Sequence, residues 1–439
     1  MLSRSFTASS KLRDRALIIA PHGSYRTAPF IKAANNLNID ILIASQGEHS
    51  IVSEYVQGLH IDFQNENQAI DIILSEAEKR PFSGIIGTDD TTTELAAHVA
   101  GKLNLPHNDP QAVKIAQRKD FSRISLKKAG VKIPQFDLLT TTEPLSQQNI
   151  KVNFPAVVKP IALSASRGVI RVNNFQELEQ AVERDRNLLA AELHMDKEVQ
   201  EMLLLEEFIP GKEVAVEAML HGVESGGSEL DILAIFDKPD PLDGPFFEET
   251  YYVTPTSFSE KIQQEIKETV LAACQAYGLK EGPVHAECRV NGMGVWILEV
   301  AARTIGGLCG RLLSLGTGYS LEELVLLHAI GKRAEIKTIK SSELGLGVLM
   351  IPIPGAGILK RVEGLLEAQR IPYINEVSIE VRDGYELIPL PEGNSYLGFI
   401  FAEAPTVKEA EQALRDAHNC LNIVLAPLWK ISGNIPASN

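Results

Sequence analysis

The sequence of 439 residues lacks the features that mark several large classes of protein. It contains four cysteines, Cys274, Cys288, Cys309 and Cys420, with neither metal-ligand spacing nor a disulfide pattern. That scarcity favours a reducing intracellular compartment, so we expect a cytoplasmic protein. No apolar run approaches the length needed to span a membrane, and we see no internal repeat, low-complexity tract or coiled coil.

An excess of positive charge is also missing. The chain has 42 Lys and Arg against 57 Asp and Glu, a formal net charge of −15. Surfaces that bind nucleic acid are normally basic, so we expect no nucleic-acid partner. The apolar content of 44% and the charged content of 23% are typical of a globular protein. Because the chain is too long for one ordinary core, two or three domains are expected.

The first thirteen residues are rich in serine and contain three basic residues but no acid. An organelle-targeting segment has this kind of composition. A frayed terminus is the simpler interpretation of residues 1–13, because chain ends are commonly disordered.

Short apolar segments alternate with helical patterns in the first 113 residues. The segments are Ala16–Ala20, Asp40–Ala44 and Gly84–Gly87, with a helix near 66–79. This alternation predicts a parallel α/β domain over residues 1–113, in which ligands bind beyond the carboxyl ends of the strands. The candidates at such ends are His22, Gly23, Asp89 and Asp90. Turn and helix-cap chemistry is the simpler explanation of each one taken singly.

Residues 114–335 show a different pattern, with helices and strands that indicate an α+β layer of mainly antiparallel pairing. The predicted helices are Arg118–Ala129, about 175–200 and about 258–277. The predicted strands are Ala156–Lys159, Gly168–Val172, Leu203–Ile209, Glu213–Leu220 and Asp231–Phe236. The last segment, 336–439, carries the Pro- and Gly-rich stretch Ile351–Gly357 in its first part and closes with a helix at 406–422.

Two carboxylates interrupt neighbouring apolar strands. Glu287 lies in Gly282–Val290 and Glu299 in Val295–Arg303, and the Asn-Gly-Met-Gly turn between these runs is typical of a hairpin. A buried carboxylate is costly unless a positive group satisfies it. Mg²⁺ fits, because it binds one or two carboxylates and completes its shell with substrate phosphates. Arg303 adds a fixed positive charge, so the hairpin indicates phosphoryl transfer.

Two lysines are candidates for holding phosphates. Lys159 ends a strand and precedes a loop of small residues that reaches Gly168, and the amides of such a loop can bind an anion. Lys119 opens a helix and could reach the same phosphates. Surface exposure is the alternative for either lysine taken alone.

The segment Leu203–Ile209 offers the groups that an adenine base needs, namely an apolar slot and the backbone of a strand that turns into a loop. Glu213 follows at a distance suited to ribose hydroxyls. Taken by itself, the segment is better explained as a hairpin with exposed glutamates.

Taken in order, these pieces resemble the ATP-grasp superfamily of carboxylate–amine ligases. The segments IPIPGAGILKRVEG and SYLGFIFAEAPTVKEAEQAL are similar to the C-terminal domain of the L-amino acid ligase branch, which forms dipeptides. The resemblance implies an ATP-grasp fold of three parts. These are an N-terminal α/β pre-ATP-grasp domain over 1–113, an ATP-grasp domain over 114–335 with a mobile subdomain at about 151–222, and a C-terminal α+β ligase domain over 336–439.

On the nucleotide side, Lys119 and Lys159 match the two phosphate-binding lysines of the family. The loop that closes over the phosphates is matched by Ser164, Ser166, Arg167 and Gly168, although Ala162 and Ala165 leave it poorer in glycine than usual. The adenine hinge is matched by Glu206, Glu207, Phe208 and Ile209, and the ribose position by Glu213.

On the catalytic side, Glu287 and Glu299 match the metal carboxylates. Arg303 and Gly306 match the pair that stabilises charge on the acyl centre. The chain departs from the family at Ala301, where many members have an asparagine ligand, so the number of bound metal ions is open.

The resemblance implies an ADP-forming ligase that uses ATP with Mg²⁺, or with Mn²⁺ as the alternative metal. A substrate carboxylate would attack ATP to give an acylphosphate, and an amine would then displace phosphate. Small carboxylic acids and amines are the expected partners, and the oligomeric state is open, with a homodimer among the alternatives. Glu248 and Glu249 are candidates for binding the ammonium group, with solvent-facing acids as an equal alternative.

Two rival functions fit parts of this pattern. One is another ATP-grasp enzyme, such as a carboxylase or a ligase of the purine pathway. The second is a non-catalytic ATP-binding protein on the same fold. The presence of both lysines, both carboxylates and Arg303 disfavours the non-catalytic reading.

Overall fold

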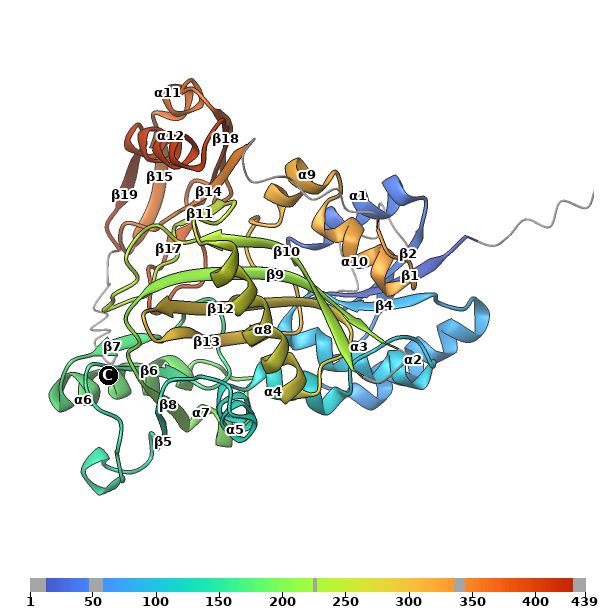
Figure 1. Cartoon of the computed structure of the whole chain (residues 1–439), viewed down its shortest axis with the longest axis horizontal. Coiled ribbons are helices and arrows are strands. Elements are labelled where there is room, and N and C mark those ends of the chain that lie inside the picture. Colours follow the sequence, from blue (N-terminus) through green and yellow to red (C-terminus); the bar gives the residue numbers. More distant parts are fainter. Residues whose placement is uncertain (1–12, 47–57, 224–226, 335–343, 429–439) are drawn as a thin grey trace, which may run out of the picture.

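A parallel α/β domain forms the beginning of the chain in the computed structural model, which describes residues 13–46, 58–223, 227–334 and 344–428 (Figure 1). Its sheet has the order β3-β2-β1-β4. The strands are β1 Arg15–Ile19, β2 Asp40–Ser45, β3 Gly58–His60 and β4 Gly84–Gly87, and the helices are α1 Thr27–Leu37, α2 Glu66–Lys79 and α3 Asp90–Lys102.

Strand β1 is buried along its whole length because helices cover both faces of this sheet. Ala16 and Ile18 pack on the side of α1, whereas Leu17 and Ile19 pack on the side of α2 and α3. This two-sided burial is why the strand reads as a continuous apolar run. The parallel α/β prediction is confirmed.

A separate four-stranded antiparallel sheet follows, with the order β5-β8-β6-β7. Helices α4 Pro110–Gln117 and α5 Lys119–Ala129 lead into it. Its elements are β5 Phe136–Thr140, β6 Ala156–Pro160, β7 Ile170–Val172, α6 Phe175–Ala190, α7 Lys197–Gln200 and β8 Met202–Glu207. The single helix expected over about 175–200 is thus two helices, because the chain turns after Ala190. We call residues 136–207 the lid.

The largest sheet has eight strands in the order β13-β12-β9-β10-β11-β14-β18-β16, and every pairing in it is antiparallel. Its strands are β9 Lys212–Gly222, β10 Ser228–Asp237, β11 Tyr251–Thr254, β12 Gly282–Asn291, β13 Gly294–Ala301, β14 Gly345–Ile351, β16 Ile374–Ile379 and β18 Gly398–Ala404. Strand β9 therefore belongs to this sheet, although the mobile subdomain was expected to extend to residue 222. The boundary expected at 335/336 lies outside the described residues, and the sheet continues on both sides of it through β11 and β14.

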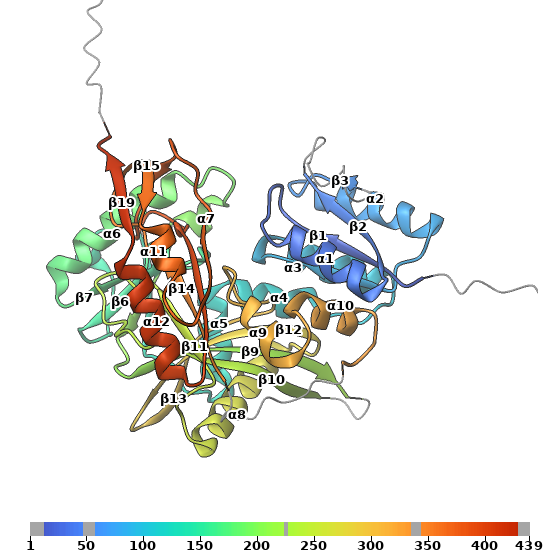
Figure 2. The ribbon, with the colours of Figure 1, turned by 90° about the horizontal axis from the view of Figure 1, so that it is seen from above.

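Helices and a small sheet complete the fold. The helices are α8 Glu260–Tyr277, α9 Arg311–Thr317, α10 Leu321–Ala329, α11 Leu365–Gln369 and α12 Val407–Asn419, and the small sheet has the order β17-β15-β19. Its strands are β15 Gly357–Glu363, β17 Glu386–Leu387 and β19 Asn422–Ala426. Seen from above, the first domain lies apart from the C-terminal elements, which lie on the side of α6 and β7 (Figure 2).

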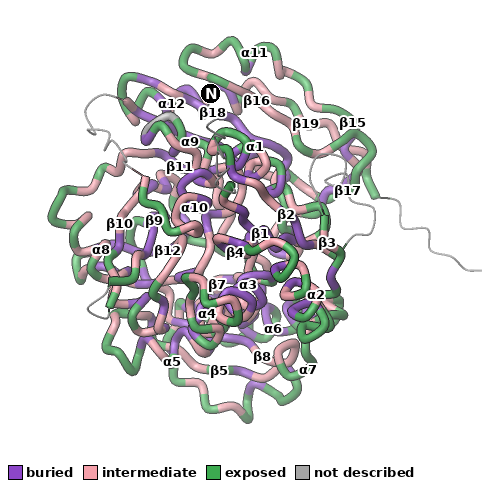
Figure 3. The backbone as a smooth tube through the Cα atoms, turned by 90° about the vertical axis from the view of Figure 1, so that its right-hand side faces the viewer, coloured by how far each residue is buried: buried purple, intermediate pink, exposed green. Residues whose placement is uncertain are grey.

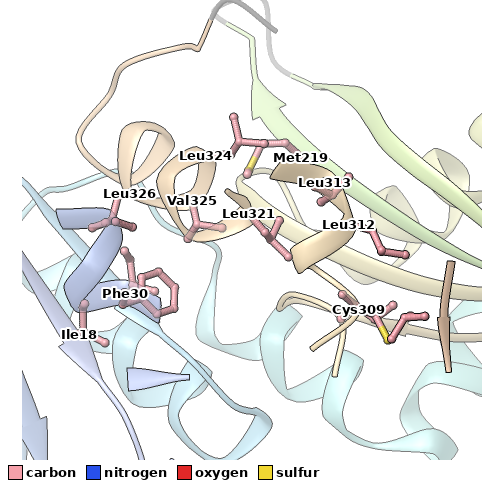
Figure 4. Close-up of a cluster of buried hydrophobic side chains, with 14 of the residues drawn as sticks. Ile18, Phe30, Met219, Cys309, Leu312, Leu313, Leu321, Leu324, Val325 and Leu326 are labelled. Carbon is pink, nitrogen blue, oxygen red and sulfur yellow. The ribbon is translucent and has the colours of Figure 1, made fainter. Parts of the chain in front are cut away.

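One apolar core joins the first domain to the large sheet. Phe30 of α1 packs in the same cluster as Leu324 and Val325 of α10, Leu312 of α9 and Met219 of β9 (Figure 4). Each such side chain contributes about 1.5–3 kcal/mol when fully buried. The buried positions follow the strands and the inner faces of the helices (Figure 3). Among the described residues, no helix combines the length and the apolar character that crossing a membrane requires.

Candidate active site

Lys159 is the last residue but one of β6 and is held by a buried carboxylate. Its Nζ lies 2.5 Å from Oε2 of Glu206, and Arg123 of α5 pairs with the other oxygen of Glu206. Burial lowers the pKa of Lys159, although Glu206 opposes that effect. Burial by itself would raise the pKa of Glu206, but Arg123 and Lys159 hold it below its ordinary value. The side chain of Glu206 thus fixes the position of the lysine, while its backbone leads into the predicted hinge.

Lys119 connects the lid with the hairpin. It is the first residue of α5, and its Nζ donates to the carbonyl of Leu163 at 2.6 Å. The same Nζ lies 3.7 Å from Oε2 of Glu299. One ammonium group therefore lies between the predicted phosphate loop and a predicted metal carboxylate, where a nucleotide phosphate would also need positive charge.

The predicted phosphate loop joins β6 to β7. Ala165 and Ser166 have φ angles of 57° and 56°, and Gly168 has φ 68°. A Cβ on Gly168 would lie 2.6 Å from Oδ1 of Asp185, so glycine is required there for space as well as for backbone conformation. Ser164 is exposed and Ser166 is half-buried.

The predicted hinge follows β8. The amides of Glu207 and Phe208 donate to the carbonyls of Gln135 and Pro155, and Ile209 is buried. The Phe208 ring lies 4.2 Å from the guanidinium carbon of Arg171. An aromatic ring and a guanidinium group thus lie next to the turn.

Glu213, the predicted ribose ligand, is buried and already paired. Its Oε1 accepts from Lys238 at 2.8 Å and its Oε2 accepts from Arg289 at 3.0 Å. The carboxylate therefore lies at the edge of a charged cluster rather than free in the hinge.

Glu287 and Glu299 are direct partners across the β12–β13 hairpin, as the turn between them predicted. A bulge follows Glu287 in this pairing. The side chains retain 21% and 34% exposure, so both can reach a ligand on the same side of the sheet. Two oxygen donors of this kind suit Mg²⁺, whose other positions phosphates and water would fill. Ala301 is buried and offers no ligand atom.

Lys238, which the sequence interpretation did not single out, lies at the centre of three carboxylates. Its Nζ is 2.8 Å from Glu213 and 3.0 Å from Glu287, and it also pairs with Glu249. Burial would lower the pKa of Lys238, but the three carboxylates raise it well above its ordinary value. The sequence held one signal that could have found Lys238: it directly follows an apolar strand, and a similar position was the reason for choosing Lys159.

The pKa values of two carboxyl groups in this cluster are shifted in opposite directions. Burial raises the pKa of Glu249 to about 8, with the charge of Glu287 adding to the effect. Glu287 has its pKa held well below the ordinary value, because Lys238 and His285 outweigh its burial. Oxygens of Glu213, Glu249 and Glu287 lie within 4.8 Å of one another, which is close enough to hold a cation.

Arg303 follows β13 and joins the large sheet to the first domain. Its Nε lies 2.8 Å from Oδ1 of Asp90, and it donates to the carbonyl of Thr304 at 3.0 Å. Burial would lower the pKa of Arg303, but Asp90 and Glu299 raise it above its ordinary value. Gly306 is half-buried, and a Cβ there would meet nothing within 4 Å.

The strand-end candidates of the first domain have different surroundings. Asp89 caps α3 in a capping box with Thr92 and lies 3.5 Å from Nε of Arg26. Asp90 holds Arg303, whereas His22 is exposed. Glu248 is half-buried, and burial raises its pKa.

Comparison with known families matches three parts of the chain. Residues 31–107 match an ATP-grasp N-terminal domain, 152–311 an ATP-grasp domain and 349–426 the L-amino acid ligase C-terminal domain 2. A solved L-amino acid ligase from Bacillus licheniformis superposes with a TM-score of 0.77 at 25% identity, over 94% of this chain and all of the other.

The chain is an L-amino acid ligase-like ATP-grasp protein.

Curated relatives of this ATP-grasp protein are distant. The uncharacterized protein y4rH of Sinorhizobium fredii is 23% identical over 97% of this chain and 86% of its own length. The alanine–anticapsin ligase of Bacillus subtilis is 25% identical over 62% of this chain, which spans 59% of that protein. These matches place the chain among the ADP-forming carbon–nitrogen ligases. A solved N5-carboxyaminoimidazole ribonucleotide synthetase from Thermotoga maritima, at 17% identity and a TM-score of 0.66, shares the fold.

Proposed function

We propose that this protein joins an amino acid or another small carboxylic acid to an amine through an acylphosphate, with release of ADP and phosphate. The observation that carries the proposal is the position of Lys119 between the carbonyl of Leu163 and Glu299. It brings the predicted phosphate loop and the predicted metal carboxylates to one place. The names of the L-amino acid ligase and the alanine–anticapsin ligase support amino acids as substrates.

In the first step a substrate carboxylate oxygen attacks the γ-phosphorus of ATP, and ADP leaves. Lys119 and Lys159 would bind phosphate oxygens, and the loop 162–168 would exclude water from the acylphosphate. Glu287 and Glu299 would hold Mg²⁺, which neutralises charge on the phosphates.

In the second step the amine nitrogen attacks the acyl carbon, and phosphate leaves. Arg303, held by Asp90, and the backbone near Gly306 would stabilise the negative charge that develops on the acyl oxygen. Glu249, which pairs with Lys238 in this structure, would accept the ammonium group of a substrate.

Phosphate release from ATP and Mg²⁺ across a panel of amino acid pairs, with mass detection of products, tests this function. Release that requires both an acid and an amine, together with a new amide mass, is the expected result. Bicarbonate-dependent release would favour a carboxylase instead. ATP binding without release for any acid, amine or bicarbonate would favour a non-catalytic protein.

Replacement of the catalytic groups provides a second test. Glu299→Gln and Arg303→Ala are each expected to lower the turnover number by at least about 10²-fold, because each removes a charge that acts on the transition state. Glu363→Gln, at an exposed position of the small sheet, is the matched control and should retain full turnover. Near-normal turnover of either site variant would contradict the assignment.

The use of Mn²⁺ in place of Mg²⁺ and a homodimeric assembly stay predictions. Metal substitution in the same assay and the mass of the protein in solution would test them.

The interpretation of residues 1–13 concerns a segment that lies outside the described residues, apart from Arg13.

A further inference from the structure

A buried glutamate in the middle of β9 takes no part in the reaction outlined above. Glu217 is fully buried, and its Oε2 accepts the backbone N–H of Ile305 at 3.0 Å. Its Oε1 has no hydrogen-bond partner in the described part of the chain. Burying a carboxylate costs several kcal/mol unless it is well compensated. A leucine would fill this position in a sheet core at lower cost, so a role beyond packing is indicated.

The amide that Glu217 accepts belongs to the segment with the acyl-stabilising groups. Ile305 lies between Arg303 and Gly306, in the connection from β13 to α9. That connection is rich in glycine, so its backbone has many conformations to lose. Three side chains from outside this connection hold it: Glu217 at Ile305, Asp90 at Arg303, and Arg26, whose Nη1 donates to the Thr304 hydroxyl at 2.5 Å.

Glu217 is also linked, through His285, to the proposed metal ligand Glu287. His285 is its direct partner on β12, with Nδ1 at 3.4 Å from Oε2 of Glu217. The other ring nitrogen, Nε2, lies 3.8 Å from Oε1 of Glu287. The imidazole is buried, and its Nδ1 makes no hydrogen bond in the described part of the chain, so it meets the two carboxylates at ion-pair distance. A continuous line of contacts thus runs from the Ile305 amide through Glu217 and His285 to Glu287.

We propose that Glu217 is a positioning residue, which fixes the segment 303–306 against the sheet and, through His285, sets its place relative to Glu287. The inference rests on the proposed roles of Arg303, Gly306 and Glu287. Charge-stabilising groups act only when held within a few tenths of an ångström of the productive geometry. A rigid central strand is suited to impose that precision on an irregular segment.

Glu217→Leu and Glu217→Gln test the hydrogen bond from the Ile305 amide to Glu217, which we call the tether. Glu217→Leu keeps the volume but removes the acceptor, and it is expected to lower the turnover number about 10²-fold. The KM for ATP should stay within about twofold, because Lys119, Lys159 and the hinge lie on other elements. Glu217→Gln retains an oxygen for the Ile305 amide and is expected to recover most of the loss. A Leu variant with normal turnover, or a Gln variant as slow as the Leu variant, would overturn the proposal.

His285→Asn tests the link to Glu287 without relying on activity. Mg²⁺ titrated in the presence of ADP should raise the unfolding midpoint of the natural protein. The variant is expected to need about tenfold more Mg²⁺ for half of that rise, as for other residues that orient metal ligands. An unchanged Mg²⁺ dependence would overturn this part of the proposal.

Hydrogen exchange separates this inference from the proposed function. Peptides covering 302–310 should exchange at least tenfold faster in Glu217→Leu than in the natural protein, whatever reaction the protein catalyses. Glu323→Gln, which changes a buried glutamate that caps α10, is the matched control and should leave that exchange and the turnover unchanged. Unaltered exchange over 302–310 in Glu217→Leu would overturn the proposal that Glu217 fixes this segment. The absence of an amide product from the natural protein, for every substrate pair, would instead contradict the proposed function.

Discussion

At the scale of the residue, Lys238 decides the charge balance of the proposed site. Its ammonium group lies among Glu213, Glu249 and Glu287, with the ring of Tyr252 at 5.2 Å. Three carboxylates this close would repel one another if the lysine were removed. A divalent cation held by Glu287, as proposed above, would compete with the Lys238 ammonium group for that carboxylate.

We expect Lys238→Met to lower both stability and turnover. Breaking a buried ion pair by removal of one partner typically costs about 3–5 kcal/mol, because the remaining charge stays buried. Chemical unfolding and the amide-forming assay would measure the two effects. Lys261→Met, on the exposed face of α8, is the control. Natural stability in the Lys238 variant would show that the three carboxylates do not depend on the lysine.

Asp185 of α6 makes stability depend on pH. It is fully buried beside Gly168, and burial raises its pKa from the ordinary 3.8 to about 8. Between these two values the folded protein binds a proton that the unfolded chain releases. The contribution of Asp185 to stability therefore falls as the pH rises from about 4 to about 8.

We expect Asp185→Asn to remove this dependence. The natural protein should lose about 2–3 kcal/mol relative to the variant between pH 5 and pH 7, at about 1.4 kcal/mol per pH unit. Urea unfolding of both proteins at the two pH values measures the difference. Parallel pH profiles would show that the carboxyl group ionises without penalty in the folded state.

At the scale of the element, the lid is attached to the C-terminal part of the chain. The amide of Gly168 donates to the carbonyl of Pro391 at 2.9 Å, and Arg167 donates to the carbonyl of Glu392 at 3.2 Å. The carboxylate of Glu392 pairs with both Nε and Nη2 of Arg184 on α6. The segment around Pro391 thus holds the lid at the end of its phosphate loop.

We expect Glu392→Gln to loosen this attachment. The KM for ATP should rise several-fold, and more ADP should be released per amide formed, because a loosely closed site admits water to the acylphosphate. The ratio of ADP to amide product is the measurement. Glu183→Gln, which removes a pair made within α6 alone, should keep the natural ratio. An unchanged ratio in the Glu392 variant would show that closure does not depend on this contact.

At the scale of the whole molecule, the eight-stranded sheet unites segments that the sequence suggested were separate domains. Residues Tyr251–Thr254 pair with Leu346–Leu349, and the core of the first domain includes Val348 and Phe401.

A chain ending at residue 334 would expose the edge of β11 and part of that core. We expect it to show no cooperative thermal transition by circular dichroism, whereas a chain ending at residue 428 should unfold cooperatively. Cooperative unfolding of the shorter chain would show that the first two parts fold independently of the third.

Local patterns in the sequence determined much of this protein. The continuous apolar run at Ala16–Ala20 required a strand buried on both faces, and the Asn-Gly-Met-Gly turn required a hairpin that places Glu287 opposite Glu299. The ordered set of lysines, glutamates and Arg303 was enough to indicate the ATP-grasp family. These features depend on neighbours in the chain, which a sequence displays directly.

Contacts between distant segments were decided only by the tertiary structure. Nothing near Lys238 in the sequence indicates that Glu213, Glu249 and Glu287 surround it, and nothing near Ile305 indicates a carboxylate on β9. The pairing of Arg303 with Asp90 likewise links residues 213 positions apart (303 minus 90). Partners of this kind are chosen by the order of strands in the large sheet and by the packing of the first domain against it. Both follow from the burial of apolar surface over the whole chain rather than from any local pattern.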